Sequence, residues 1–335
     1  MRTNGTRARR VAARRPGSVV VIAGASSGIG RATARRYASE GARLVLASRS
    51  STALEEVVAE CRAAGAEAIA VPTDVRDEAA VRALAERAVR EFGRIDVWVT
   101  AAGVFAYGGF EDLPPDIFRQ VVETNLMGQV HAARAALPQF RRQRSGTLVM
   151  VGSLYSRVGS PLVSPYVTSK FGLLGFAIVL RQELRRERGI RIRIVLPSTI
   201  DTPIYQNAAN VTGRRVHPLP PVSSPERVAR AIAAAPHRRR FATHVGQSQR
   251  AAILVQRFAP GIHDWLTGTL KRTVELRGSG EPATDGTVFA PPAHAGGTTG
   301  RWRSWPVRAG GAIAGAVLAV LAVLGARAAQ RKPSA

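Results

Sequence analysis

The amino-acid sequence predicts an α/β protein built on a doubly wound parallel sheet, and three observations favour this class. Short runs rich in Val, Ile and Leu alternate with amphipathic stretches between about residues 17 and 246. These runs are continuously apolar, which is typical of parallel strands covered on both faces. A glycine-rich turn follows the first run. Repeated β–α–β units of this length imply about seven strands joined by right-handed crossovers.

The expected strands are short, and the stretches between them have the period of helices. Val81, Leu84 and Ala88 recur at helical spacing and predict one amphipathic helix. Strands are expected at 18–23, 43–47, 67–71, 95–101, 146–152, 191–196 and 241–245.

The chain outside the predicted α/β domain (17–246) divides by composition. Residues 1–16 are polar and basic, which predicts a disordered arm. Residues 247–276 have helical periodicity and predict a helical extension. Residues 277–308 are rich in Gly, Pro and Thr and predict a flexible linker.

Residues 309–326 form an uncharged apolar run that predicts a transmembrane helix, and 327–335 form a basic tail. At ~1.5 Å rise per residue the run spans ~27 Å, close to the ~30 Å of a bilayer core. Trp302 and Trp305 stand where an interfacial aromatic belt is expected. A buried Ala/Gly-rich helix is the alternative. We favour the anchor because the run follows a predicted linker.

The net charge of +25 does not by itself indicate a nucleic-acid partner. Of the 48 basic residues, 45 are arginine, and they are spread along the chain without a nucleic-acid-binding motif. A solvated basic surface is the simpler interpretation, and attraction to an anionic membrane is the alternative. The single cysteine, Cys61, excludes an intrachain disulfide and lies in an apolar helical stripe, which predicts a core position. No metal site is predicted, because the six histidines lack metal-ligand spacing.

Tyr166 and Lys170 are the first candidate site residues. Lysine occurs only three times in the chain, yet one lysine stands four residues after a tyrosine. On a helix these two side chains share a face and can point into one site. A tyrosine that transfers a proton needs its pKa lowered from ~10, which a compact neighbouring cation does. Arginine, a wide fork, seldom substitutes there. A surface pair remains the alternative for this motif alone.

The turn after the first strand, residues 24–30, is the second candidate site. Glycine lets such a turn close tightly and lets the backbone approach a pyrophosphate, which the helix N-terminus binds through its free N–H groups. The residues expected to contact the dinucleotide are Gly24, Ser26, Ser27, Gly28, Ile29 and Gly30.

Taken together, these motifs make residues 17–246 resemble the short-chain dehydrogenase/reductase family. Ser153 stands thirteen residues before Tyr166, the spacing of that family's catalytic serine. Asn125 begins an N-x-x-G motif that matches the family's central helix.

The resemblance also implies cofactor contacts beyond the glycine turn. Asp74 and Val75 follow the third strand, where the family contacts adenine. The segment from Pro197 to Thr202 matches the proline-initiated segment whose threonine holds the nicotinamide carboxamide. Gly103 ends the segment after the fourth strand and completes the expected cofactor contacts.

The resemblance assigns roles to four catalytic residues. Tyr166 donates a proton to a carbonyl oxygen, or accepts one from a hydroxyl. Lys170 lowers the pKa of Tyr166 and binds the nicotinamide ribose. Ser153 stabilises charge on the reacting oxygen. Asn125 holds a water that connects Lys170 to solvent. The nearby Tyr155 and Ser156 have the wrong spacing for these roles.

Two positions depart from the family pattern. Thr100-Ala101-Ala102-Gly103 replaces N-N-A-G, which removes a side-chain amide that usually braces the strands near the cofactor. This change is expected to loosen the cofactor floor. Ser198 replaces the glycine after Pro197 and is expected to restrict a turn.

The end of the second strand indicates which cofactor is bound. An acidic residue there would hold a ribose 2′-hydroxyl and select NAD. The chain has Ser48 followed by Arg49, which suits a 2′-phosphate. The sequence therefore favours NADP, with NAD as the alternative.

The sequence thus predicts a membrane-anchored, NADP-preferring oxidoreductase that interconverts an alcohol and a carbonyl compound of apolar character. Its catalytic domain is expected on the cytoplasmic side, where the cofactor is found. Gly311 and Gly315 could let two anchors pack, which is compatible with a homo-oligomer. A catalytically idle scaffold protein at the membrane and a nucleic-acid binder are the alternatives, and the complete set of catalytic residues argues against the first.

Overall fold

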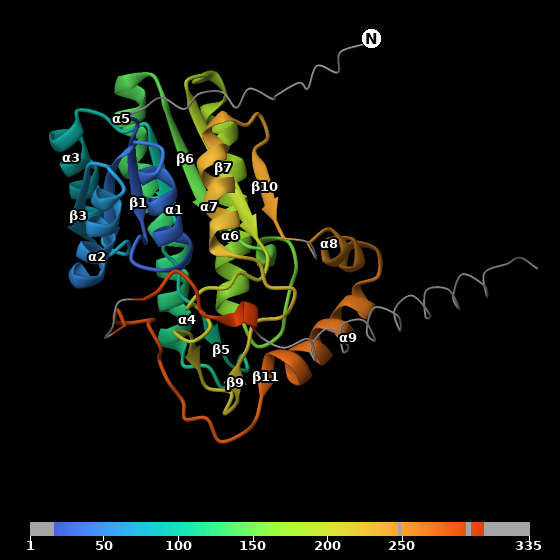
Figure 1. Ribbon diagram of the computed structural model, residues 1–335. Helices are drawn as coiled ribbons and strands as arrows, with labels where there is room; N and C mark the ends of the chain where they lie inside the picture. Colours follow the sequence, from blue (N-terminus) through green and yellow to red (C-terminus); the bar gives the residue numbers. More distant parts are fainter. Residues whose placement is uncertain (1–16, 247–248, 293–295, 305–335) are drawn as a thin grey trace, which may run out of the picture.

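The computed structural model describes residues 17–246, 249–292 and 296–304 (Figure 1). Its centre is a seven-stranded parallel sheet with the strand order β10-β7-β6-β4-β1-β2-β3. The strands are β1 (Val19–Ala23), β2 (Arg43–Ser48), β3 (Ala68–Pro72), β4 (Val97–Thr100), β6 (Gly146–Val151), β7 (Ile190–Pro197) and β10 (Ala242–Val245). The order reverses between β1 and β4, and open α/β sheets bind ligands in the crevice at such a point.

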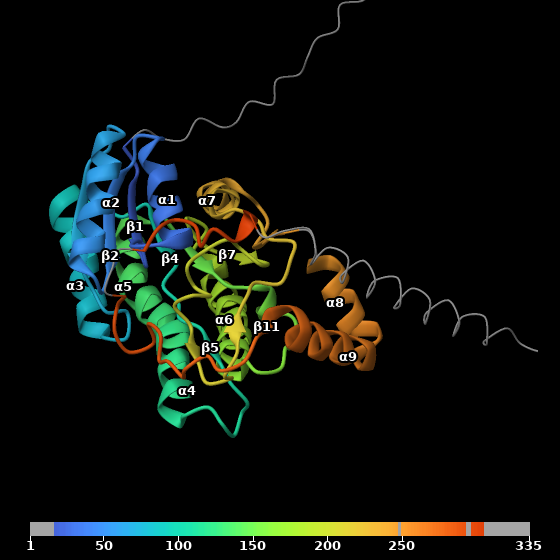
Figure 2. The ribbon, with the colours of Figure 1, turned by 60° about the horizontal axis from the view of Figure 1, so that its bottom comes forward.

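Helices cover both faces of the sheet (Figure 2). Helices α1, α2 and α7 pack on one face, and α3, α5 and α6 pack on the other. Their bounds are α1 (Gly28–Ala38), α2 (Ser51–Ala63), α3 (Glu78–Phe92), α5 (Gly128–Gln143), α6 (Ser164–Glu183) and α7 (Pro225–Ala234). The doubly wound parallel sheet predicted from the alternating pattern is therefore confirmed.

Burial explains why the strands have continuously apolar sequences. All five residues of β1 and all six of β6 are buried, because helices cover these central strands on both faces. The edge strand β3 is only partly buried. Cys61 is fully buried in the core on the α1–α2 side, as its apolar stripe predicted. Burial raises the pKa of its thiol to about 11.

A smaller layer lies beyond the carboxyl ends of the strands, and the sequence did not predict its pieces. Strand β5 (Ala106–Tyr107) pairs with β8 (Ala209–Asn210), and β9 (Arg215–Val216) pairs with β11 (Leu276–Arg277). Helix α4 (Pro115–Val122) continues through a π-helical turn, η1 (Glu123–Met127), into α5. The short 3-10 turns are η2 (Leu154–Ser156), η3 (Leu184–Arg186), η4 (Ala235–His237) and η6 (Trp302–Ser304).

The C-terminal part adds α8 (Gln249–Phe258), α9 (Pro260–Leu270) and a π-helical turn, η5 (Lys271–Glu275). Helices α8 and α9 project from the body of the molecule (Figure 2). The buried ammonium of Lys271 lies 2.8 Å from the carboxylate of Glu275, which also accepts a 2.7 Å hydrogen bond from the Tyr107 hydroxyl. This cluster joins the C-terminal helices to the smaller layer beyond the carboxyl ends of the strands.

The described part of 277–308 is bound to the domain and is not a free linker as expected. The Thr284 and Thr287 amides donate to the carbonyls of Asn210 and Asn207, and Val288 is fully buried. Trp302 is half-buried and donates through Nε1 to the Thr202 carbonyl at 3.2 Å, so it packs against the domain. The composition predicted a flexible linker because composition alone does not show that residues 207–210 would form hydrogen bonds with the backbone of this segment.

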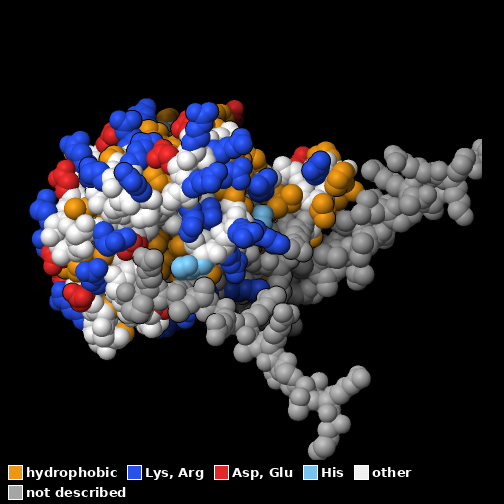
Figure 3. Space-filling view, turned by 90° about the horizontal axis from the view of Figure 1, so that it is seen from above, with side chains coloured by type: hydrophobic (Ala, Val, Ile, Leu, Met, Phe, Trp, Pro, Cys, Tyr) orange, Lys and Arg blue, Asp and Glu red, His pale blue; other side chains and the backbone are white. Residues whose placement is uncertain are grey.

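Within the described residues, no helix is both long and apolar enough to cross a bilayer. The uncharged run 309–326, Trp305, the basic arm 1–16 and the tail 327–335 lie outside the described residues. On the face seen in Figure 3, arginines are distributed widely and acidic side chains lie among them. Several arginines are ion-paired, such as Arg141 with Glu187.

Candidate active site

The turn between β1 and α1 has the geometry that its glycines predict. Gly24 and Gly28 have φ values of 87° and 50°, which glycine adopts without strain. A Cβ on Gly24 would lie 2.3 Å from the Ala102 amide nitrogen, and one on Gly30 would lie 1.8 Å from the Gly24 carbonyl oxygen. The turn therefore packs backbone against backbone and opens the N-terminus of α1 toward the crevice, which fits the pyrophosphate of a dinucleotide.

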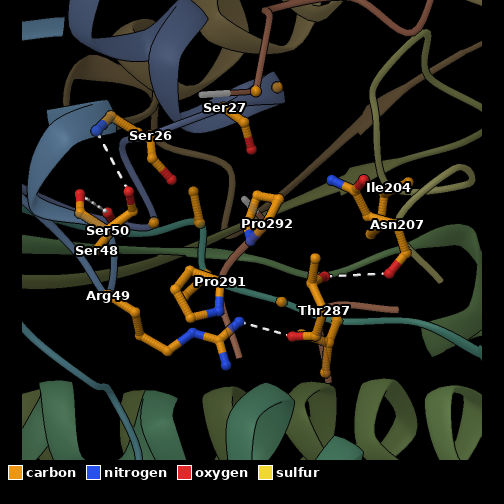
Figure 4. Close-up of a pocket in the computed structure, with 18 of the residues that line it drawn as sticks. Ser26, Ser27, Ser48, Arg49, Ser50, Ile204, Asn207, Thr287, Pro291 and Pro292 are labelled. Atoms are coloured by element: carbon orange, nitrogen blue, oxygen red, sulfur yellow. Dashed lines mark hydrogen bonds between the residues drawn. The ribbon is translucent and has the colours of Figure 1, made fainter. Parts of the chain in front are cut away.

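A cleft of about 170 Å³ follows the carboxyl ends of the strands beside this turn (Figure 4). It brings together most residues that the sequence predicted as cofactor contacts: Gly24, Ser26, Ser27, Gly28, Ile29, Ser48, Arg49, Asp74, Val75, Gly103 and Thr202. Of the other predicted contacts, Gly30 packs beneath the turn, and Tyr166, Lys170 and Pro197 line a neighbouring pocket.

The charged groups at the far end of the cleft are already paired. Arg49 donates to the carbonyl of Thr287 at 2.7 Å and to that of Val288 at 3.4 Å (Figure 4). Burial lowers the pKa of Arg49. Asp74 accepts hydrogen bonds from Arg76 at 2.9 and 2.5 Å. Burial alone would raise the pKa of Asp74, but the bonds from Arg76 lower it below its usual value.

Tyr166 and Lys170 lie on one face of α6, as their spacing predicts. Both are buried, at 8% and 3% exposure, and the Lys170 ammonium lies 5.4 Å from the centre of the Tyr166 ring. Ser153 follows β6, lines the same pocket as Tyr166, and its hydroxyl acts to lower the pKa of the Tyr166 phenol. The structure thus brings the three predicted reacting groups together.

The electrostatics of this group differ from the expectation for Lys170. Burial raises the pKa of Tyr166 well above its usual value, and the bond with Ser153 lowers it only in part. The Lys170 ammonium donates to the Val151 carbonyl at 3.0 Å and is not among the groups that set the pKa of Tyr166. Burial in turn lowers the pKa of Lys170 to about 8. In this state the tyrosine is a firmly protonated acid.

Asn125 lies in the π-helical turn η1, and single π turns are frequent at functional sites. Its side chain is fully buried and bonds both backbone groups of Val104, accepting from the amide at 2.8 Å and donating to the carbonyl at 2.9 Å. It also donates to the Ser169 hydroxyl at 3.3 Å. Asn125 therefore fixes the segment that follows β4, next to Gly103 and Lys170.

Gln129 compensates for the amide missing from the segment after β4. This buried residue stands one turn after Asn125 and accepts a short hydrogen bond from the Thr100 hydroxyl. It also donates to the Ala102 carbonyl at 3.5 Å. The expected loosening of the cofactor floor is therefore not observed. The sequence signal was a second amide side chain on the same helical face as Asn125.

Ser198 is also accommodated, contrary to the expectation that it restricts a turn. Its φ is not positive, and its amide donates to the Val245 carbonyl at 2.8 Å. The glycine that this contact needs is on the neighbouring strand end. Gly246 has a φ of 138°, and a Cβ there would lie 1.8 Å from the Ser198 hydroxyl. The glycine at this contact is therefore Gly246 and not the residue after Pro197.

A second pocket of about 490 Å³ adjoins the cleft and contains Ser153, Tyr166 and Lys170 at one end. Its walls are mainly apolar. They include residues of the segment 204–221 and residues of α8 and α9. The residues from those two helices and η5 are Ala251, Ala252, Val255, His263, Leu266, Thr267, Leu270 and Glu275.

A parallel sheet with a glycine turn at its switch point, beside a Ser–Tyr–Lys group, defines the class of dinucleotide-dependent α/β oxidoreductases. The model of the short chain dehydrogenase family matches residues 18–211. The chain is 35% identical over 251 residues to the uncharacterized oxidoreductase YxnA of Bacillus subtilis (strain 168), covering 74% of this chain and 70% of that protein. The protein belongs to the short-chain dehydrogenase/reductase family.

Two further similarities agree with this assignment. Dehydrogenase/reductase SDR family member 7B of Bos taurus is 32% identical over 256 residues, with 73% of this chain and 78% of that protein covered. The crystal structure of a short chain dehydrogenase/reductase from Burkholderia phymatum, in complex with NAD, superposes with a TM-score of 0.67 at 27% identity. That superposition covers 74% of this chain and 96% of the other.

The buried ammonium of Lys170 leads to a prediction about stability. Its pKa is about 8 in the folded state and 10.5 in the unfolded state, so unfolding is favoured wherever the lysine is charged. The cost is full below pH 8 and disappears as pH rises from 8 to 10.5, because only the unfolded state holds the proton in that window. We expect Lys170→Met to raise the free energy of unfolding at pH 7 by up to roughly 3 kcal/mol.

Urea unfolding of both proteins at pH 7 and pH 10 measures this difference. Lys271→Met is the matched control with the opposite sign. Lys271 is paired, and its pKa is raised because Tyr155 and Glu275 outweigh the effect of burial. Removing it leaves the buried carboxylate of Glu275 without a cation, with only the Tyr107 hydroxyl as a partner, and destabilises the fold. A Lys170→Met protein that is equally less stable at both pH values would contradict the analysis.

Proposed function

We propose that this protein is an NADP-preferring oxidoreductase that interconverts an apolar alcohol and the corresponding ketone or aldehyde. One observation supports this function above the others. Tyr166 and Ser153 both line the apolar pocket that adjoins the cofactor cleft. Gly103 and Thr202 line both cavities, so a substrate in one lies beside a cofactor in the other.

The side chains at this junction suit proton transfer. The Tyr166 phenol carries its proton at neutral pH and lines the substrate pocket, so it can donate that proton to a carbonyl oxygen during reduction. The Ser153 hydroxyl can bond the same oxygen and stabilise the charge that develops on it. Lys170 supplies an ammonium one helical turn away. The nicotinamide, when bound, supplies or accepts the hydride.

The preference for NADP rests on the residues at the end of β2. Arg49 lines the cofactor cleft, and Ser48 stands where NAD-selective proteins carry an acid. A guanidinium binds a 2′-phosphate in bidentate fashion, whereas an acid there would repel it. The related crystal structure contains NAD, so NAD is the alternative cofactor.

The apolar character of the substrate rests on the pocket. Its volume of about 490 Å³ is within the usual range for small-molecule sites, and its walls are mostly apolar. We also propose that the protein works at a membrane, with its catalytic domain on the cytoplasmic side. The uncharged run 309–326 supports this location. The outer surfaces of α8 and α9 further expose the apolar side chains of Leu254, Phe258 and Trp265.

A catalytically idle scaffold is the weaker alternative. A scaffold has no need for a buried lysine whose charged form destabilises the fold. It also does not require a phenol, a hydroxyl and an ammonium in one pocket. The reaction therefore explains these residues better.

Tyr166→Phe should abolish turnover while leaving the Kd for NADPH within a few fold, because only the proton-transfer group is lost. Lys170→Arg should also lower kcat severely, although it keeps the charge, because the fork does not fit the buried site. NADPH oxidation against carbonyl compounds of graded size and polarity measures both effects. Tyr37→Phe, the same change in a buried residue of α1, is the control and should keep its activity. Near-normal rates for Lys170→Arg would exclude the geometric role of the lysine.

Cofactor preference can be tested at the end of β2. The unmodified protein should bind NADPH more tightly than NADH, and Ser48→Asp should shift the preference toward NADH. Fluorescence titration with both cofactors measures the two Kd values. Ser39→Asp adds the same charge at the exposed end of α1 and should leave the ratio unchanged. Equal affinities in the unmodified protein would show that Arg49 does not select the cofactor.

Membrane attachment can be tested by fractionating cells that express three forms of the protein. The full chain should enter the membrane fraction, and a chain ending at residue 304 should enter the soluble fraction. Leu318→Arg combined with Leu321→Arg keeps the length but places two charges in the run, each costing about 3 kcal/mol near a bilayer centre. This double variant should also be soluble. If all three forms are soluble, 309–326 is not an anchor, and the proposal that the protein works at a membrane loses its support.

A further inference from the structure

The segment that follows β11 crosses the cofactor cleft on the surface of the domain (Figure 1). We call residues 284–292 and 296–302 the C-terminal strap. Its first part is fixed beside β8, where Thr284 and Asn210 exchange backbone hydrogen bonds of 3.0 and 2.7 Å. Val288 is fully buried in the hydrophobic core of the smaller layer beyond the carboxyl ends of the strands.

The last part of the strap is fixed on the other side of the cleft. The amides of Gly300 and Trp302 both donate to the Asp201 carboxylate, at 3.0 and 2.8 Å. The Trp302 indole donates to the Thr202 carbonyl and lies edge-on to the ring of Tyr205. The strap is therefore held at two places, with the cofactor cleft between them.

Between these points the strap binds groups that a dinucleotide would need. The Gly28 amide at the N-terminus of α1 donates to the Gly297 carbonyl at 3.1 Å. Next to it, Arg31 donates to the Gly296 carbonyl at 2.8 Å. At the other end of the cleft, Arg49 donates to the Thr287 carbonyl at 2.7 Å. Backbone carbonyls thus occupy donors expected for the pyrophosphate and the 2′-phosphate.

The strap also takes up space in the cleft. Figure 4 shows Pro291 and Pro292 in the middle of the labelled residues, with Ser27 above them and Arg49 and Thr287 below. Both prolines line the cleft, whose volume of about 170 Å³ is below the ~300 Å³ at which small-molecule sites begin. A Cβ on Gly296 would lie 2.8 Å from the Cβ of Ser27, which shows how closely the strap approaches the glycine turn.

We propose that the C-terminal strap is an autoinhibitory cover of the cofactor site, and that a dinucleotide binds only after residues 296–302 have left the N-terminus of α1 and the Asp201 carboxylate. This inference rests on the proposed function. The exchange is chemically favourable, because phosphate oxygens accept stronger hydrogen bonds than neutral carbonyls and suit a helix N-terminus better. The apparent affinity is nevertheless lowered by the fraction of molecules whose strap is closed.

Two glycine-to-alanine variants of the full chain test this proposal as a matched pair. A Cβ on Gly300 would lie 2.3 Å from the Trp302 indole nitrogen and 2.6 Å from the Thr202 carbonyl oxygen, so Gly300→Ala should force the end of the strap away. A Cβ on Gly297 would have its nearest neighbour at 3.5 Å, so Gly297→Ala should leave the strap in place. Neither glycine has a φ in the left-handed region, so alanine adds no backbone strain.

The first readout is the Kd for NADPH, measured by titration without substrate. We expect Gly300→Ala to lower this Kd at least threefold and Gly297→Ala to change it less than twofold. Trp302→Ala removes the indole contact by another route and should match Gly300→Ala. Its control is Trp265→Ala, which changes a tryptophan exposed on α9.

The second readout is hydrogen exchange of the Gly300 and Trp302 amides, which are bonded to Asp201 in the closed strap. In the unmodified protein, saturating NADPH should speed this exchange, because binding opens the strap. In Gly300→Ala the exchange should be fast with or without the cofactor.

The outcomes separate the strap from the proposed function. The strap proposal is overturned, and the oxidoreductase proposal stands, if NADPH binds the unmodified protein while these amides stay protected. It is equally overturned if Gly300→Ala and Trp302→Ala bind NADPH no more tightly than their controls. If no variant binds NADPH or NADH, the proposed function is wrong, and the strap proposal fails with it.

Discussion

The turn after β1 and the segment after β4 meet backbone to backbone, and both cavities depend on this contact. A Cβ at Gly24 would collide with the amide of Ala102, so the two strand ends approach this closely only because glycine is present. The contact leaves the N-terminus of α1 open toward the crevice. Two buried amide side chains, Asn125 and Gln129, hold the segment after β4 from the opposite side. The result is a rigid floor with the cofactor cleft on one side and the substrate pocket on the other.

The sequence predicted this frame because its signals are local and periodic. A strand covered on both faces must be apolar throughout, as β1 is, and a helix must repeat every three to four residues. The two-residue strands β5, β8, β9 and β11 are too short to have a period, so no pattern could reveal them. The exchange between Ser198 and Gly246 was equally hidden. It is a contact between two strand ends that are far apart in sequence, and Ser198 alone looks like a departure from the family.

The C-terminal segment shows how a prediction from composition can fail. Gly, Pro and Thr lower the local preference for regular structure, but they do not prevent the backbone from bonding to another loop. Two isolated apolar residues, Val288 and Trp302, attach this segment to the domain. If 309–326 is an anchor, only residues 305–308 separate it from the last described residue. A membrane-bound domain would then lie close to the lipid surface, because it would lack the flexible linker of about thirty residues that the composition predicted.

Lysine is rare in this chain, so a position that has lysine and not arginine indicates a specific need for a compact ammonium group. Many of the arginines are exposed, where water solvates the planar, always charged guanidinium well. The two lysines in the described part of the chain are both buried, and each lies where a compact ammonium is needed. Lys271 is stabilised by Glu275, so its charge supports the packing of the C-terminal helices around the substrate pocket. Lys170 has no carboxylate among the causes that set its pKa, and burial alone lowers it. The buried charge of Lys170 lowers the stability of the fold, so its place beside Tyr166 is better explained by a role in proton transfer.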